Sequence, residues 1–126
     1  MEHKMKLYEE PFLAIQSGKK TVEIRLHDPK RRKVKRGDTI EFAKLPGEDD
    51  KITVKVKKLC TYPTFREMFE DIPAEKFGIV DNNIEKRVNS IHTLYSPERE
   101  QEWGSLAIEI ELLFPPKTVD KLLKEL

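Results

Sequence analysis

The sequence predicts an α+β fold: a small, partly closed mixed β-barrel of about five to six strands, with helices packed beside one opening. The expected elements run strand, helix, three strands, a helical insertion, one strand and a tail helix. Loops join the second, third and fourth strands, which argues against a parallel doubly wound sheet. The alternation of apolar residues along 51–59 changes phase at Leu59, which indicates a bulge or bend of the kind that barrels use.

Length and composition indicate one compact domain. The chain has 126 residues, and we place a single domain at 1–115 and a C-terminal amphipathic helix or tail at 116–126. One cysteine, Cys60, excludes an internal disulfide, and three histidines lack ligand spacing, so we expect no metal and no cofactor. There is no signal-peptide core and no apolar run near the roughly 20 residues of a membrane span, so we expect a soluble, cytoplasmic protein without a membrane partner. Nothing in the sequence indicates an oligomeric state.

The first half of the chain alternates between strand and helix signals. Residues 4–8 form a short strand, and a helix follows over 9–18, with Pro11 in its first turn and Gly18 in a left-handed position after its end. Residues 20–26 then alternate like a strand. The apolar residues of this strand fall on one face, and the polar residues Thr21, Glu23 and Arg25 fall on the other.

Further strands and helices follow from the same reasoning. Strands at 39–43 and 51–59 put branched and aromatic residues on one face. Helical spacing and N-caps then predict helices that begin after Thr64 and after Ser96, the latter with Pro97 in its first position, and another within 82–96. The closing strand at 105–113 alternates apolar residues with glutamates.

Charge is distributed unevenly along the chain. Residues 1–60 carry a net charge of +6, and residues 61–126 carry −5. The basic half contains the run Lys30–Arg36, with six cations in seven positions. Such a run attracts polyanions, nucleic acid among them, through Coulomb forces and counterion release. The alternative interpretation is a solvated loop beside acidic neighbours.

Ionic side chains gather where the 20–26 strand begins. Lys19, Lys20, Thr21, Glu23 and Arg25 lie within seven positions of each other. Same-face side chains at i and i+2 are about 7 Å apart, so Glu23 and Arg25 can share one ligand or one cross-strand partner. A regular strand would point Lys20 to the opposite face, and it joins the others only if the chain twists after Gly18. This group is therefore either a salt-bridged outer face or the floor of a site.

Two tyrosines are candidates for contacts with bases. Tyr62 and Tyr95 could stack on nucleobases, and His92 could move a proton. Helical spacing favours a core position for Tyr95 and the edge of the buried stripe for His92. Trp103 is interpreted mainly as a packing residue.

These segments together resemble the ASCH domain family. The signature of that family reads Gly-x-Lys-x-x-Glu-x-Arg and falls here on Gly18, Lys20, Glu23 and Arg25. The Gly-Asp pair at 37–38 before a strand and the late segment from Tyr95 to Ile110 are also similar. The resemblance covers roughly residues 5–113. It implies a PUA-like barrel with a cleft beside it, lined by the signature residues.

The resemblance also implies candidate functions. Family members are thought to bind RNA, some deacylate a modified cytidine with a lysine, a threonine nucleophile and a glutamate, and some are reported as ribonucleases. Lys20 matches the lysine of the deacylating type. Glu23 occupies the position of the threonine, and Thr21 lies two residues earlier.

We therefore carry three hypotheses. In the first, the domain binds RNA or a nucleotide. Glu23 would orient Arg25 and accept a hydrogen bond from a base or a 2′-hydroxyl. The other ligand contacts would come from Lys19, Lys20, Arg25, Arg31, Arg32, Tyr62 and Tyr95. In the second, it is a small hydrolase of a modified nucleoside (N-acylcytidine amidohydrolase-like) or a ribonuclease, with Lys20 and Glu23 as acid–base pair and Thr21 or water as nucleophile. In the third, the acidic helical half is a protein-interaction module.

Overall fold

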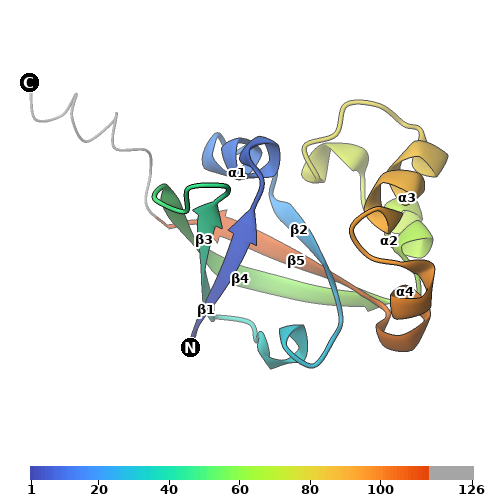
Figure 1. The fold of residues 1–126 in the computed structure, drawn as a ribbon, viewed down its shortest axis with the longest axis horizontal. Coiled ribbons are helices and arrows are strands. Elements are labelled where there is room, and N and C mark those ends of the chain that lie inside the picture. The colour runs from blue at the N-terminus through green and yellow to red at the C-terminus, as the bar shows by residue number, and fades with distance from the viewer. Residues whose placement is uncertain (114–126) are drawn as a thin grey trace, which may run out of the picture.

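The computed structural model describes residues 1–113 of the chain, and the tail predicted at 116–126 lies outside them. Five strands, four α-helices and two 3₁₀ turns follow each other in the described part (Figure 1). In chain order they are β1 (Glu2–Leu7), α1 (Glu9–Gln16), β2 (Val22–Leu26), η1 (Arg31–Lys33), β3 (Thr39–Lys44), β4 (Lys51–Tyr62), α2 (Phe65–Asp71), η2 (Ala74–Lys76), α3 (Ile84–His92), α4 (Pro97–Trp103) and β5 (Ser105–Leu112).

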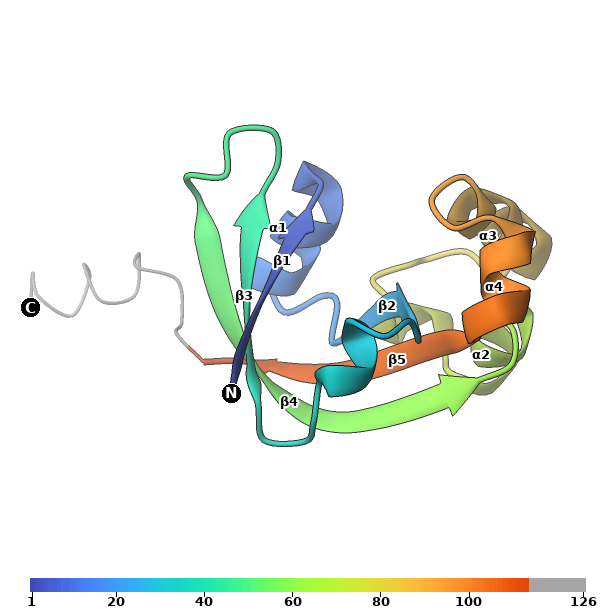
Figure 2. The same ribbon diagram turned by 60° about the horizontal axis from the view of Figure 1, so that its bottom comes forward.

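The five strands form one curled sheet in the order β1-β3-β4-β5-β2. β1 and β3 are parallel, and the other neighbours are antiparallel. The sheet curls into a half-barrel whose two edge strands are β1 and β2, with α1 near its upper rim and α2, α3 and α4 gathered at one end of the long β4–β5 pair (Figures 1 and 2). The predicted α+β half-open barrel with helices beside it is confirmed.

Local signals in the sequence locate most element boundaries. The Thr64 side chain caps α2 by accepting a hydrogen bond from the backbone N–H of Glu67, and Ser96 caps α4 in the same way, directly before Pro97. Gly18 follows α1 with φ +82°, a conformation that costs glycine little. The predicted irregularity in the 51–59 strand is a register shift between Val56 and Lys58.

The structure corrects several of the sequence-based assignments, among them the start of the first strand, which is Glu2 rather than Lys4. β2 begins at Val22 rather than Lys20, because Lys20 forms an isolated backbone bridge with Phe77 instead of pairing with a strand. β4 continues beyond Leu59 to Tyr62, where it pairs with the start of β5. The cationic segment 30–36, expected as loop, contains the 3₁₀ turn η1.

Two hydrophobic cores lie on opposite sides of β2. The first core fills the half-barrel with side chains from β1, α1, β3, β4 and β5, including Phe42 and Ile108. The second core lies between the helices and the β2–β5 pair and includes Val22, Leu26 and Phe65. The apolar face of β2 therefore packs against the helical half, which leaves its polar face toward the half-barrel.

Candidate functional site

The polar face of β2 is the inner face of the half-barrel. In the antiparallel register Glu23 lies opposite Ile108 and Arg25 lies opposite Leu106, and both partners belong to the barrel core. Side chains of directly opposite residues share a face of the sheet. Glu23 is accordingly 3% exposed and Arg25 8% exposed. Of the two interpretations that the sequence left open, the salt-bridged outer face is wrong for this pair, because helices and barrel cover both faces of β2.

Lys20, Glu23 and Arg25 meet in one ionic cluster. Lys20 Nζ lies 2.8 Å from Glu23 Oε1, and Arg25 Nη2 lies 2.8 Å from Glu23 Oε2. Arg25 Nε also donates to Oε2 at 3.0 Å, and the backbone N–H of Ile24 donates to Oε1 at 3.1 Å. Each carboxylate oxygen thus accepts two interactions. A buried carboxylate requires this compensation because burial alone disfavours its charge.

The turn after α1 brings Lys20 to this cluster. Gly18 reverses the chain in the left-handed region, and the backbone N–H of Lys20 then donates to the carbonyl of Ala14 at 3.0 Å. The lysine side chain is 11% exposed and points at Glu23. The twist that the sequence required for Lys20 to join Glu23 is therefore present.

The electrostatics of the cluster favour the charged forms. Burial raises the pKa of Glu23, but the positive charges of Lys20 and Arg25 and their hydrogen bonds outweigh it, and the pKa falls from 4.5 to about 2. Burial lowers the pKa of Arg25, while Glu23 and then the Tyr95 phenol raise it, and the net shift is upward. Glu23 is a fixed anion near neutral pH.

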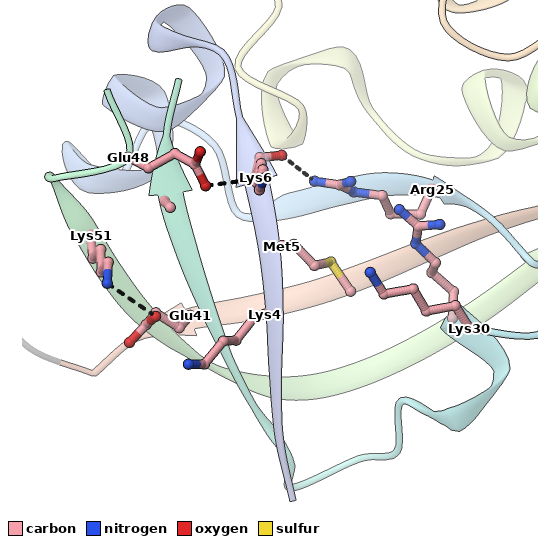
Figure 3. A pocket seen from close by; sticks show the side chains of 10 residues that line it. Lys4, Met5, Lys6, Arg25, Lys30, Glu41, Glu48 and Lys51 are labelled. Atoms are coloured by element: carbon pink, nitrogen blue, oxygen red, sulfur yellow. Dashed lines mark hydrogen bonds and ion pairs between the residues drawn. The ribbon is translucent and has the colours of Figure 1, made fainter. Parts of the chain in front are cut away.

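Arg25 also contacts the other edge of the sheet. Its Nη2 donates to the backbone carbonyl of Lys6 in β1 at 3.0 Å (Figure 3). β1 and β2 are not hydrogen-bonded to each other as strands. A side chain of one edge strand therefore spans the seam to the backbone of the other.

Tyr95 connects the cluster to the helical half. Its ring stacks on Phe65, with centroids 5.8 Å apart and planes 16° apart. The backbone N–H of Phe65 donates to Glu100 Oε2 at 2.7 Å, and Glu100 Oε1 lies 3.1 Å from His92 Nε2. The prediction that helical spacing puts Tyr95 in a packed position is supported, and its phenol also lies beside Arg25.

Other predicted site residues lie apart from this cluster. Lys19 and Thr21 are exposed, and the Thr21 hydroxyl makes no hydrogen bond with Lys20 or Glu23 within residues 1–113. The Tyr62 phenol bonds to Asp71 Oδ2 at 2.5 Å, and burial together with this bond raises its pKa to about 12. The hydroxyl of Tyr62 is thus held by α2.

The cationic turn η1 has two differently placed arginines. Arg31 Nη1 lies 2.9 Å from Asp28 Oδ2, and its Nε is buried without a hydrogen-bond partner among the described residues. Arg32 donates from Nε to the carbonyl of His27 at 2.7 Å, and its guanidinium lies 5.6 Å from the centroid of the Trp103 ring. Trp103 therefore makes a cation–π contact with Arg32 in addition to the packing role predicted for it.

A pocket of about 370 Å³ lies beside the seam between β1 and β2 (Figure 3). Arg25 is the member of the ionic cluster that lines it, whereas Lys20 and Glu23 do not. The lining residues are Lys4, Met5, Lys6, Arg25, Lys30, Arg31, Glu41, Ala43, Glu48 and Lys51.

Comparisons with known proteins agree with this fold. A family model described as ASCH domain matches residues 5–114. The chain belongs to the ASCH domain family. The crystal structure of hypothetical protein PH0355 is 40% identical, covers 90% of this chain and 100% of its own, and superposes with a TM-score of 0.80. The solution structure of protein PF0455 from Pyrococcus furiosus is 38% identical, covers 90% of this chain and 98% of its own, and gives a TM-score of 0.68.

More distant ASCH structures share the architecture. The crystal structure of ASCH from Zymomonas mobilis is 15% identical, with 87% of this chain and 66% of that chain covered and a TM-score of 0.62. At this identity the likeness shows the fold alone. A search of curated proteins found no match.

Two further findings concern the described part of this ASCH domain. Within residues 1–113, no group of three or more His, Cys, Asp or Glu side chains lies close enough to hold a metal ion. No helix in that range is long and apolar enough to cross a membrane.

Sequence reasoning missed two groups in this ASCH domain, the Lys6 carbonyl that Arg25 contacts and the Glu100 carboxylate that Phe65 contacts. The carbonyl of Lys6 is a backbone group, which no residue pattern marks. Glu100 lies in the first turn of α4, where an acidic residue is ordinary, but it is 9% exposed and accepts the backbone N–H of Phe65. Its position three residues after Pro97 gives no signal for that long-range bond.

Proposed function

We propose that this ASCH domain binds RNA or a nucleotide around Arg25. One observation carries the proposal: a guanidinium held by Glu23 and the Lys6 carbonyl has a pocket on one side and the Tyr95 phenol beside it. A fixed guanidinium suits a phosphate oxygen or a base edge.

The charges of the cluster support an anionic ligand. Two cations, Lys20 and Arg25, share one carboxylate, so the cluster keeps a net positive charge. Because Glu23 stays ionised well below neutral pH, it fixes the direction of both cations throughout the physiological range. Preorganised donors bind with less loss of side-chain entropy than flexible surface lysines do.

A binding measurement tests the proposal. The protein is titrated with a short single-stranded RNA and with uridine monophosphate over a series of salt concentrations. We expect an affinity that falls with rising salt, as displaced counterions require. Replacing Lys20 by Met leaves Arg25 as the single cation on Glu23 and removes the net positive charge of the cluster, so binding should weaken by about tenfold.

The matched control is Lys86→Met, an exposed lysine of α3 with the same charge change. It should change the affinity less than twofold or so, as a distant screened charge does. Circular dichroism shows that each variant is folded. Absence of binding at low salt, or equal losses in both variants, contradicts the proposal.

A hydrolase is the second candidate, and one observation favours it: Lys20 Nζ lies 2.8 Å from Glu23 Oε1, the spacing of a proton-transfer pair. Cations occupy both oxygens of Glu23, however, and a carboxylate with a pKa of about 2 is a weak base. Incubation with N-acylcytidine and with single-stranded RNA tests this activity. If wild type turns over a substrate and each single variant, Glu23→Gln and Thr21→Val, loses that turnover, the hydrolase is established with these catalytic residues. If turnover survives in both variants, other residues catalyse the reaction.

A further inference from the structure

The pocket beside the seam lies at the edge of the half-barrel, where Lys4 and Lys6 of the outer face of β1 meet Met5 and Arg25 of the inner face. Lys4 and Lys6 alternate along β1 with Met5 and Leu7, which point into the barrel core. In the β1–β3 register Lys4 lies opposite Glu41 and Lys6 lies opposite Ala43, so these four share the face away from the core. The seam groove, as we call the pocket with its ten lining residues, is thus separate from the buried contact of Lys20 with Glu23.

Cations dominate the lining of the seam groove. Six lining side chains are basic and two are acidic. The two carboxylates are already engaged, Glu48 with Lys6 at 3.1 Å and Glu41 with Lys51 at 3.9 Å. The remaining basic residues therefore determine the potential of the groove, since low-dielectric walls concentrate the field of one sign.

Three of the basic groups have unused donors. Lys4 and Lys30 are exposed and make no ion pair within residues 1–113. Arg31 is fixed by Asp28 through Nη1, while its buried Nε has no hydrogen-bond partner in that range. Because that Nε has almost no accessible surface, Arg31 acts on a ligand in the groove through the rest of its guanidinium and through its charge. Arg25 adds a second guanidinium to the same wall.

We propose that the seam groove binds a phosphate group. A tetrahedral anion with several acceptor oxygens can accept from two guanidinium groups and two ammonium groups at once, and Arg favours phosphate through its planar fork. The phosphate belongs to a small phosphomonoester or to a nucleic-acid backbone. The inference rests on the proposed function in that both use this pocket and Arg25, and it names phosphate as the group bound there. Lys20 and Glu23 do not line the groove, so the two proposals can fail separately.

Amide chemical shifts of ¹⁵N-labelled protein test the site directly. The full chain is titrated with inorganic phosphate, with uridine monophosphate and with a short single-stranded RNA, against sodium chloride at equal ionic strength. We expect saturable shifts at Met5, Lys6, Arg31 and Ala43. Shifts with all three probes assign the groove to any phosphate, and shifts with RNA alone assign it to a nucleic-acid backbone.

Two double variants separate the groove from general electrostatics. Lys4→Ala with Lys30→Ala removes the two unpaired lysines of the groove. Lys33→Ala with Lys35→Ala removes two exposed lysines of the cationic run that do not line it, with the same charge change. The first should lower the affinity for phosphate about tenfold and the second less than about twofold.

Arg31→Lys keeps the charge beside Asp28 but removes the planar guanidinium, and should lower the affinity about fivefold. Absence of groove shifts with all three probes overturns the inference, as do equal losses in the two double variants. Lys20→Met serves to distinguish the two proposals. If it abolishes RNA binding while phosphate still shifts the groove amides, the groove is an independent site. If none of the three probes shifts the groove amides while RNA binding still depends on Lys20, the groove inference fails and the proposed function stands.

Discussion

Arg25 Nη2 donates a hydrogen bond to the backbone carbonyl of Lys6 at 3.0 Å, which joins the two edge strands of the half-barrel. The sheet order leaves β1 and β2 at opposite edges without a ladder between them. The guanidinium therefore supplies a contact across the seam that backbone pairing does not. Arg25 therefore contributes to stability as well as lining the seam groove, and its replacement should lower the free energy of unfolding.

Replacing Arg25 by Met should destabilise the domain strongly. The variant leaves Glu23 buried with Lys20 as its remaining cation and removes the donor to the Lys6 carbonyl. Removal of one partner from a buried ion pair costs about 3–5 kcal/mol. Urea denaturation at neutral pH measures the change in the free energy of unfolding. The stability of Arg25→Lys should lie between that of wild type and that of Arg25→Met. One ammonium group cannot contact both the Glu23 carboxylate and the Lys6 carbonyl as the guanidinium does.

The control for Arg25 is Arg36→Met, which removes an exposed arginine of the cationic run. Its free energy of unfolding should change by less than about 0.5 kcal/mol, as surface substitutions do. An equal loss in the two variants would show that the seam contact contributes nothing to stability.

Many helix boundaries could be predicted from the sequence because they depend on interactions between residues close together in the chain. Thr64 and Ser96 cap helices whose own backbone N–H groups they satisfy, and Gly18 adopts a conformation that its neighbours in sequence require. The tail predicted after residue 115 lies outside the described residues and stays a prediction.

The site was predictable in part. Alternation assigned Glu23 and Arg25 to one face of a strand, but it does not say what covers that face. The cover comes from β1 and the barrel core, which are distant in sequence. In the same way, helical spacing placed Tyr95 on a packed stripe, while its position beside Arg25 depends on how the helices meet β2.

Glu23 should make stability depend on pH in the acid range. Its pKa in the folded protein, about 2, lies below its ordinary value of 4.5, so the unfolded chain binds the proton more readily. The stabilisation is fully present above about pH 4.5 and is lost as the pH falls toward 2. The shift corresponds to about 3 kcal/mol. Urea denaturation over this range measures it as the difference between wild type and Glu23→Gln.

Asp38 requires a control in that experiment, because hydrogen bonds from His3 and from the backbone N–H of Lys35 also lower its pKa to about 2. Wild type alone therefore loses stability from two groups. The contribution of Glu23 is isolated by comparing the free energy of unfolding of Asp38→Asn with that of the double variant Asp38→Asn/Glu23→Gln. This free-energy difference should become smaller as the pH falls toward 2. A difference that stays constant from neutral pH to pH 2 would show that Glu23 does not carry the acid sensitivity.

Glu100 should stabilise the helical half through the N-terminus of α2. Its Oε2 accepts the buried backbone N–H of Phe65 at 2.7 Å. Glu100→Ala leaves that donor without a partner, which costs about 2 kcal/mol, whereas Glu100→Gln keeps an acceptor oxygen and should cost less. Glu102→Ala, in the same helix but exposed, is the control and should be close to neutral. Thermal denaturation gives the midpoint temperatures of the three variants. Equal midpoints would show that the bond from the Phe65 N–H to Glu100 does not contribute to stability.

Gly104 should not tolerate alanine, because its backbone has φ +74° and a Cβ would lie 3.0 Å from the carbonyl oxygen of Tyr62. Both the left-handed backbone and the contact with a fixed backbone atom disfavour the substitution, and we expect a loss of about 2 kcal/mol or more. Gly47→Ala is the matched control, since its φ is not positive and the nearest atom, Asp49 Oδ2, would be at 3.6 Å, an ordinary contact. In urea denaturation, the free energy of unfolding of Gly47→Ala should be close to that of wild type.

Because Gly104 connects α4 to β5 and its carbonyl accepts the N–H of His27, Gly104→Ala should also shift the amide signals around η1. A Gly104→Ala protein as stable as Gly47→Ala would mean that this turn can relax away from Tyr62.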